Sequence, residues 1–228
     1  DQPAVTDPVR HATVVGAGLA GTALAHALVA RGWRVDLLDA ADGPARGASA
    51  LPVGMLSPHV TRAPTPLSRL TSLGMAATRA ELEARVPAGA GWQACEVHNR
   101  GHDPGVWPAA LVRPGALVQA WLDEARQPAG LTTVWNAPVA RLRQGTICCA
   151  PNHGSAGWQA LDAQGHVLAE APVAVVAAAF GSLALLQASA PELGATALPL
   201  RPVKGQMSLG AQHGPALAPR PQRDNGVF

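Results

Sequence analysis

The stretch HATVVGAGLAGTALAHALVARGWRVDLLD, residues 11–39, decides the fold of this chain. It opens with a short β-rich run, His11–Val15, that ends in a glycine. The segment Leu19–Ala30 is rich in alanine and leucine and long enough for a helix, and Gly32 stands where a C-terminal cap is expected. Arg34–Leu38 then alternates like a second strand. The order strand, glycine turn, helix, strand predicts a βαβ unit.

The glycine turn has the spacing G-x-G-x-x-G, and all six of its residues are candidates for cofactor binding: Gly16, Ala17, Gly18, Leu19, Ala20 and Gly21. The first glycine allows the tight turn, the second lets the backbone approach a pyrophosphate, and the third lets helix and strand pack closely. The helix start offers free N–H groups to phosphates. An ordinary βαβ unit whose glycines serve packing alone is the alternative, but the full context favours a dinucleotide site.

An acid follows at the expected place. Asp39 ends the second strand and can accept hydrogen bonds from ribose hydroxyls. Its charge argues against NADP, because a 2′-phosphate would be repelled there. Asp36, within the strand, is the weaker candidate for this task. The motif alone does not distinguish NAD from FAD.

The rest of the chain mixes helices with many short strands. The long segment Ala40–Pro66 is rich in Gly, Ala, Ser and Pro, which is typical of a functional loop. Asn99–Pro108 is predicted as a turn-rich loop, and Asp162–Gly165 as a hairpin turn. The predicted helices are Leu67–Val86, Pro114–Ala125 and Gly181–Ala188. The predicted strands are Trp92–His98, Leu131–Trp135, Val139–Leu142, Thr146–Cys149, Trp158–Leu161, His166–Glu170, Pro172–Ala179 and Leu198–Leu209.

Composition excludes several classes of protein. Hydrophobic residues make up 48% of the 228 and charged residues 14%, which supports a sizeable core rather than disorder. The net charge of +2 carries no footprint of nucleic-acid binding by composition, although a local basic groove stays open. No apolar run is long enough to span a membrane. Three cysteines without a C-x-x-C predict a reducing compartment, and Cys95, His98 and His102 form only half of a zinc pattern, so no metal is predicted.

Four segments, in order, resemble the D-amino-acid-oxidase-like FAD-dependent oxidoreductases. They are VVGAGLAG with the following LD (residues 14–39), RGAS with GMLSPH (46–59), VAVVAAAFGS (173–182) and LPLRPVKGQ (198–206). The forms GMLSPH and LPLRPVKGQ, with PLSRL at 66–70, resemble the oxidoreductase domain of the bifunctional proteins that modify the tRNA wobble uridine.

The resemblance implies an α/β fold: a Rossmann-like FAD-binding domain of the glutathione-reductase type, interleaved with an antiparallel-sheet substrate domain. We expect a linker at 1–9, FAD-binding parts at 10–65 and 113–190, and substrate-domain parts at 66–112 and 191–228. The family continues past the equivalent of Phe228, so the resemblance implies a chain truncated at its C-terminus.

The resemblance also implies roles for segments outside the glycine turn. The loop at 46–49 lies beside the FAD pyrophosphate, and the loop at 54–59 passes near the isoalloxazine. Val139 offers backbone groups to adenine, and the segment from Ala177 to Gly181 closes over the pyrophosphate side. The cofactor-binding residues implied in this way are Asp39, Ala40, Arg46, Gly47, Ala48, Ser49, Gly54, Met55, Leu56, Val139, Ala178, Ala179 and Phe180.

The implied activity is oxidation of a CH–NH bond: removal of the carboxymethyl group from 5-carboxymethylaminomethyl(-2-thio)uridine at the tRNA wobble position. The implied partners are tRNA and a methyltransferase domain in the full-length protein, in the cytoplasm. No catalytic residue can be assigned; His59, Arg201 and Lys204 are candidate substrate contacts, and His59 as a cap of its own loop is the alternative. Two other functions stay open: a glycine- or D-amino-acid-type amine oxidase, and a non-catalytic binding module.

Overall fold

The computed structural model describes residues 10–59, 63–100, 104–127, 129–148 and 155–193, with the short stretches 200–202, 207–208, 210, 213–214 and 221–223. The chain divides into two compact units. The first combines residues 1–50 with 118–202, and the second combines residues 51–117 with 203–228.

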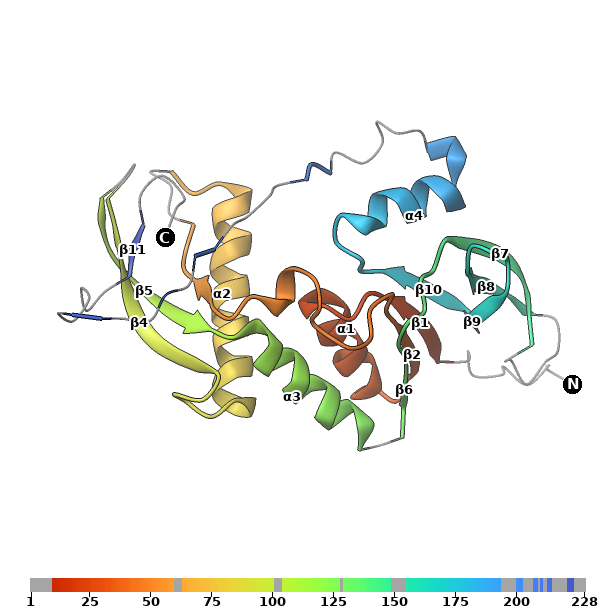
Figure 1. Cartoon of the computed structure of the whole chain (residues 1–228), viewed down its shortest axis with the longest axis horizontal. Coiled ribbons are helices and arrows are strands. Elements are labelled where there is room, and N and C mark those ends of the chain that lie inside the picture. The colour runs from red at the N-terminus through yellow and green to blue at the C-terminus, as the bar shows by residue number, and fades with distance from the viewer. Residues whose placement is uncertain are drawn as a thin grey trace, which may run out of the picture. The chain divides into compact units, whose positions relative to one another are not determined.

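A four-stranded parallel sheet forms the centre of the first unit (Figure 1). Its strands, in the spatial order β10-β1-β2-β6, are β10 (Val173–Val176), β1 (His11–Val15), β2 (Arg34–Leu38) and β6 (Leu131–Val134). The helix α1 (Leu19–Val29) connects β1 to β2. The predicted βαβ unit is therefore present, and parallel pairing places the carboxyl ends of all four strands at one edge.

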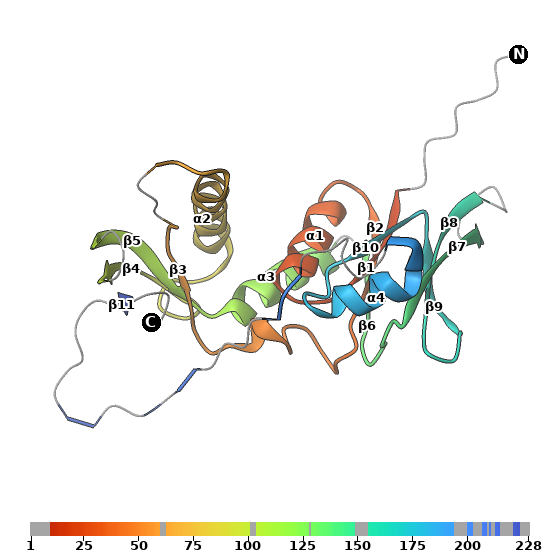
Figure 2. The same cartoon turned by 90° about the horizontal axis from the view of Figure 1, so that it is seen from above.

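The two faces of this sheet pack against different partners. On one face, Val14, Val35 and Leu37 pack with α1 and with Val118, Leu122 and Ala125 of α3 (Pro114–Arg126). On the other, Val15 and Leu38 pack with Leu142, Ala160 and Leu185. The last three come from a second sheet and from α4 (Gly181–Ser189). Figure 2 shows α1 and the second sheet on opposite sides of β1 and β2.

The second sheet of this unit is antiparallel and has the order β7-β8-β9. Its strands are β7 (Arg141–Ile147), β8 (Ser155–Leu161) and β9 (Val167–Ala171). Between β8 and β9, the Asp162 carboxylate accepts the N–H groups of Gln164 at 2.9 Å and His166 at 2.8 Å. These bonds close the hairpin turn that the sequence predicts.

The second unit contains another sheet, with the order β11-β4-β5-β3, and one long helix. The elements are β3 (Gly54–Leu56), α2 (Pro66–Arg85), β4 (Trp92–Asn99), β5 (Gly105–Val112) and β11 (Gln222–Arg223). The helix starts with a capping box, in which Thr65 and Ser68 exchange side-chain-to-backbone hydrogen bonds. Leu82 of α2 is buried, and the Trp92 indole N–H donates to the Val86 carbonyl oxygen at 2.9 Å.

Three expectations about local structure are wrong. The predicted loop Asn99–Pro108 overlaps β5, which pairs antiparallel with β4 along its whole length. Pro108 is tolerated because it lies beyond the end of β3, which pairs only with residues 110–112. Residues 138–140 lie outside any strand, and β7 instead runs continuously through Gly145.

The predicted strand Leu198–Leu209 falls mostly outside the described residues. Its described parts, 200–202 and 207–208, are not in a strand. The two remaining described elements are short helical turns, η1 (Ala48–Ala50) and η2 (Pro191–Leu193).

Candidate cofactor site

The glycine turn after β1 is built by close backbone contacts. Gly16 has φ +110°, and a Cβ there would lie 2.5 Å from the Ala177 carbonyl oxygen. A Cβ on Gly21 would overlap the Gly16 carbonyl oxygen. Glycine is therefore required at both positions, at the first for its positive φ and at the second for the close approach of α1 to the turn.

Asp39, at the carboxyl end of β2, fastens this turn. Its Oδ2 accepts the Ala17 N–H at 2.6 Å and its Oδ1 accepts the Ala41 N–H at 2.9 Å. The carboxylate thus ties the glycine turn to the loop after β2. Each oxygen keeps a second lone pair, so the group can still accept from a ribose hydroxyl.

Asp36, the weaker candidate for that task, is committed elsewhere. Arg34, which can only donate, lies 2.8 Å from Nδ1 of the buried His11, so that nitrogen accepts. The His11 Nε2–H therefore donates to Asp36 at 2.7 Å. These three side chains join the amino-terminal ends of β1 and β2, away from the edge where ligands bind.

Ser49 lies over the start of α1. Its Oγ accepts the Leu19 N–H at 3.1 Å, and α1 has no side-chain cap of its own from Gly18. Because the Ser49 oxygen accepts there, its own proton is available to a ligand. The Gly18 N–H donates to no acceptor within the described part of the chain.

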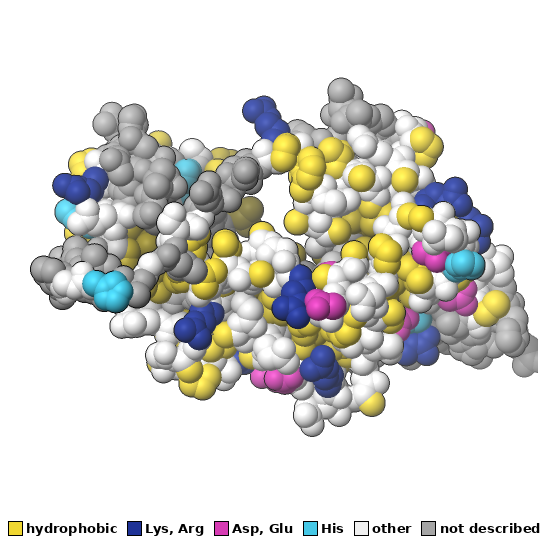
Figure 3. All heavy atoms as spheres, in the orientation of Figure 1, with side chains coloured by type: hydrophobic (Ala, Val, Ile, Leu, Met, Phe, Trp, Pro, Cys, Tyr) yellow, Lys and Arg dark blue, Asp and Glu magenta, His cyan; other side chains and the backbone are white. Residues whose placement is uncertain are grey.

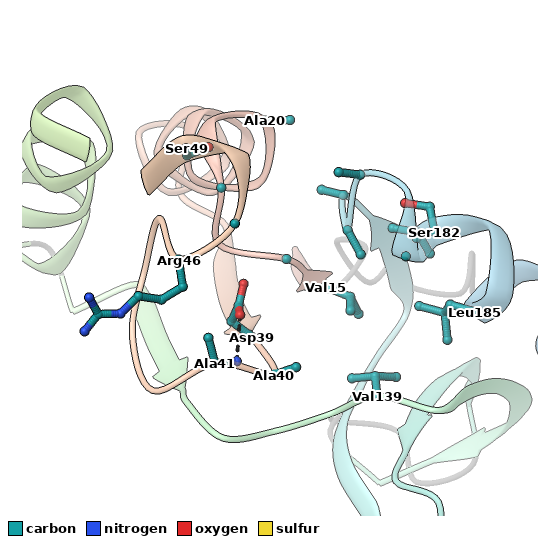
Figure 4. Close-up of a pocket in the computed structure, with 18 of the residues that line it drawn as sticks. Val15, Ala20, Asp39, Ala40, Ala41, Arg46, Ser49, Val139, Ser182 and Leu185 are labelled. Carbon is teal, nitrogen blue, oxygen red and sulfur yellow. Dashed lines mark hydrogen bonds between the residues drawn. The ribbon is translucent and has the colours of Figure 1, made fainter. Parts of the chain in front are cut away.

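These groups line a cavity of about 830 Å³ at the carboxyl edge of the parallel sheet. Its volume is within the range of small-molecule and cofactor pockets. Thirteen of the predicted cofactor residues line it: Gly16, Gly18, Leu19, Ala20, Asp39, Ala40, Arg46, Gly47, Ala48, Ser49, Val139, Ala178 and Ala179. Figure 4 shows Asp39 near the base of this cavity, bonded to Ala41, with Val139 and Leu185 on the opposite wall.

The remaining predicted cofactor residues lie elsewhere. Ala17 and Gly21 are buried beneath the turn. Phe180 is 51% exposed at the start of α4. Gly54, Met55 and Leu56 form β3 in the second unit and are not among the residues that line this cavity.

Ala177 and Gly181, the ends of the segment predicted to close over the pyrophosphate, also line the cavity. Several lining residues were not among the sequence predictions: Val15, Ala41, Ala137, Pro138, Val176, Ser182 and Leu185. Val15 and Val176 could have been anticipated, because ligands bind beyond the carboxyl ends of parallel strands. Ala137 and Leu185 carry no local signal.

The candidate substrate contacts are divided between the two units and the residues that the structure does not describe. His59 and Arg201 are exposed, in different units, and Lys204 lies outside the described residues. Within the described ranges, no three side chains of the metal-binding types lie together, and no helix is long and apolar enough to cross a membrane.

The cavity fits the pyrophosphate-containing half of a dinucleotide. Gly18 and Ser49 offer donors at the positive end of the α1 dipole. The space beside Gly47 is empty, because a Cβ there would meet no atom within 4 Å. The Arg46 guanidinium is bonded to Asp42 at 2.8 Å and points away from the labelled cavity residues in Figure 4. Phosphates there would be held by neutral donors and the helix dipole.

Comparison with known proteins agrees with this geometry. The family model described as FAD dependent oxidoreductase matches residues 11–105. A bifunctional protein for tRNA 5-methylaminomethyl-2-thiouridine biosynthesis, MnmC, from Verminephrobacter eiseniae is 38% identical over 251 residues, covering 93% of this chain and 38% of that protein. Residues 11–105 of the chain are therefore similar to the FAD dependent oxidoreductase family. The MnmC protein of Polaromonas sp. is 36% identical and is covered to 38% of its length, so the chain spans little more than a third of these relatives.

Solved structures of FAD dependent oxidoreductase type share the fold. Glycine oxidase from Geobacillus kaustophilus superposes with a TM-score of 0.55 at 16% identity, over 78% of this chain and 58% of that one. Fructosyl amine: oxygen oxidoreductase from Aspergillus fumigatus superposes with a TM-score of 0.54 at 16% identity, over 81% and 52%. The cofactor of the family is FAD.

Proposed function

We propose that this chain is the FAD-binding part of an oxidoreductase acting on a CH–NH bond, and that its substrate is the 5-carboxymethylaminomethyl group of the tRNA wobble uridine. The observation that carries the substrate is the 38% identity to an MnmC protein over 93% of this chain. The cavity beyond β1 and β2 supports the cofactor.

The chain's own residues would hold and orient the cofactor. The Gly18 N–H and the Ser49 hydroxyl would donate to the phosphates, and Asp39 would accept from a ribose hydroxyl. The backbone of residues 137–139 would face the adenine, which a backbone N–H and C=O pair can recognise without a specific side chain. These roles are all binding roles.

Bound FAD supplies a hydride acceptor. The substrate methylene carbon, between the amine nitrogen and the carboxylate, loses a hydride, and the nitrogen loses its proton to solvent as the C=N bond forms. Water then adds across that bond, and its cleavage releases glyoxylate and leaves the aminomethyl nucleoside. The substrate carboxylate needs a cation. Arg201 is the candidate among the described residues, and Lys204 the one outside them.

The remaining expectations are part of the same proposal. Residues 10–65 and 113–190 would serve the cofactor, and residues 66–112 and 191–228 the substrate. The relatives are named bifunctional, which supports a second, methyltransferase activity in the full-length protein. A tRNA substrate is consistent with a cytoplasmic location.

Two measurements test the proposal. First, an absorbance spectrum of the purified chain supplied with FAD should show flavin bands, and chromatography should identify the released cofactor as FAD. Second, tRNA carrying 5-carboxymethylaminomethyluridine should be converted to the aminomethyl form, with one glyoxylate per nucleoside by mass spectrometry. Glycine and a D-amino acid serve as comparison substrates.

The outcomes separate cofactor from substrate. Flavin bands with turnover of glycine but not of tRNA would replace the tRNA substrate with a small amine. A chain that gains no flavin signal at saturating FAD would contradict the cofactor role of this cavity.

A further inference from the structure

A second cavity, of about 530 Å³, lies in the second unit against the first turns of α2. It shares no lining residue with the cofactor cavity. His59 lines it from the segment after β3, and Arg69 and Ser72 line it from the helix. The two nitrogen-bearing side chains therefore reach one cavity from separate segments.

Both of these side chains lack partners in the described part of the chain. Neither the His59 ring nor the Arg69 guanidinium makes a hydrogen bond or ion pair there. No carboxylate is among the described lining residues, and the first turn of α2 contains no acid. The other two arginines of α2 differ, because each is paired four residues away, Arg79 with Glu83 and Arg85 with Glu81.

Arg69 is exposed to solvent at a helix position that disfavours a cation. It lies four residues after the cap residue Thr65, near the positive end of the α2 dipole, where a cation is disfavoured. An imidazole from a separate segment shares the same cavity. Two basic side chains therefore share a place where the helix dipole disfavours cations, and no acid is among the described lining residues. Departures from local preference of this kind are expected at binding sites.

The hydroxyl groups at the cavity cannot supply the missing contacts. The Ser68 hydroxyl donates to the Thr65 carbonyl oxygen at 3.0 Å, and the Ser72 hydroxyl donates to the Ser68 carbonyl oxygen at 2.8 Å. Their protons are therefore used within the helix. Among the described lining residues, the side-chain donors left for a ligand are the Arg69 guanidinium and a His59 ring N–H.

We infer that this cavity is an oxyanion-binding site, with Arg69 as its principal donor and His59 as its second. A guanidinium binds phosphate or carboxylate through two parallel N–H groups. A lysine ammonium, which is a point charge, does not provide this geometry. The oxyanion is a phosphodiester of an RNA substrate or a free phosphate or carboxylate. The RNA source rests on the proposed function, whereas the site itself does not.

The charge distribution favours a local site over a broad surface. On the face drawn in Figure 3, the described arginine side chains are dispersed among apolar, neutral and acidic ones. Such a surface can provide one or two phosphate contacts at a defined cavity. The affinity for RNA is therefore expected to depend only weakly on salt concentration.

The test compares Arg69→Gln with Arg79→Gln. Both remove one charge from the same helix, but only the first removes a lining residue of the cavity. Binding of a labelled RNA anticodon stem-loop is followed by fluorescence anisotropy at several salt concentrations. Arg69→Gln should weaken binding about tenfold and reduce the slope of log K against log salt by about 0.7–0.9, the loss of one phosphate contact. Arg79→Gln should leave the slope unchanged.

A second arm uses inorganic phosphate alone, with the His59 ring and Arg69 side-chain resonances followed by NMR. Saturable shifts in the original chain that disappear in Arg69→Gln, with RNA binding unaffected, would support the site with a small anion as its ligand. Equal RNA effects in both variants and no saturable phosphate shift would overturn the inference. Flavin content and tRNA turnover are scored separately, so failure of the proposed function removes the RNA arm but leaves the phosphate readout intact.

Discussion

The close approach of α1 to the glycine turn predicts opposite effects for one substitution at two helical positions. Gly21→Ala adds a methyl group in α1, and Gly74→Ala adds the same group in α2. A Cβ at Gly74 would meet no atom within 4 Å, whereas a Cβ at Gly21 would overlap the Gly16 carbonyl oxygen and lie 3.4 Å from the Ala177 Cβ.

The magnitudes follow from these surroundings. Replacing glycine by alanine in an open helix raises the free energy of unfolding by about 1 kcal/mol. The same gain applies at Gly21, but the overlap there is with backbone, and Gly16 is held by its N–H bond to the Leu38 carbonyl oxygen at 2.7 Å. Overpacking of this kind costs about 1–3 kcal/mol and more where backbone must move. We expect Gly21→Ala to be net destabilising and the two variants to differ by about 2–4 kcal/mol.

Hydrogen exchange measured peptide by peptide is the suitable assay, because the two glycines belong to different compact units. Peptides of β1 and α1 should lose protection in Gly21→Ala, and peptides of α2 should gain it in Gly74→Ala. Gly21→Ala should also weaken FAD binding, since the turn that lines the cavity must shift. Equal stabilisation by both substitutions would refute the close helix–turn contact.

Three further predictions concern other residues. Asp39→Ala leaves two backbone N–H groups without their acceptor and should lower the free energy of unfolding by about 2–4 kcal/mol. Asp42→Ala removes only an exposed ion pair and should lower it by less than about 1 kcal/mol. Urea titration measures both changes. Ala179 has φ +50°, so Ala179→Gly should stabilise the chain or leave it unchanged within about 1 kcal/mol, and a melting temperature that falls by several degrees would contradict the left-handed geometry. Burial raises the pKa of the Cys95 thiol, so less thiolate is present at neutral pH. In a variant with the other two cysteines replaced by serine, Cys95 should be alkylated more slowly than free cysteine. The rise of its alkylation rate with pH should occur at higher pH than for free cysteine.

The parts of the fold that the sequence predicts are those with strong local patterns. The βαβ unit, α2 and the turn at Asp162 depend on periodicity, glycine placement and capping within a few residues. β5 escaped prediction because its eight residues, with a proline among them, become a strand only by pairing with β4. Strand formation depends on such non-local partners more than helix formation does.

The cofactor cavity likewise has one part that the sequence predicts and one part that it does not. The glycine turn, Asp39 and the loop at 46–49 are recognisable in the chain itself, because their chemistry is local to a motif. The opposite wall comes from Ala137–Val139 and Ser182–Leu185, about a hundred residues or more later. The parallel pairing of β6 with β2 brings the first of these segments to the turn, and that of β10 with β1, which sets Val176 beside Val15, brings the second.

The sequence by itself therefore determined the βαβ unit, the glycine motif and the resemblance to the FAD dependent oxidoreductases. The tertiary structure decided that Asp39 fastens the turn while Asp36 is bound to His11, that Ala179 takes a left-handed conformation, and that Arg69 and His59 share a cavity. Alanine, aspartate and arginine occur in many environments, so their identity carries little information about their partners. Those partners are set by which distant segments the packed sheets and helices place side by side.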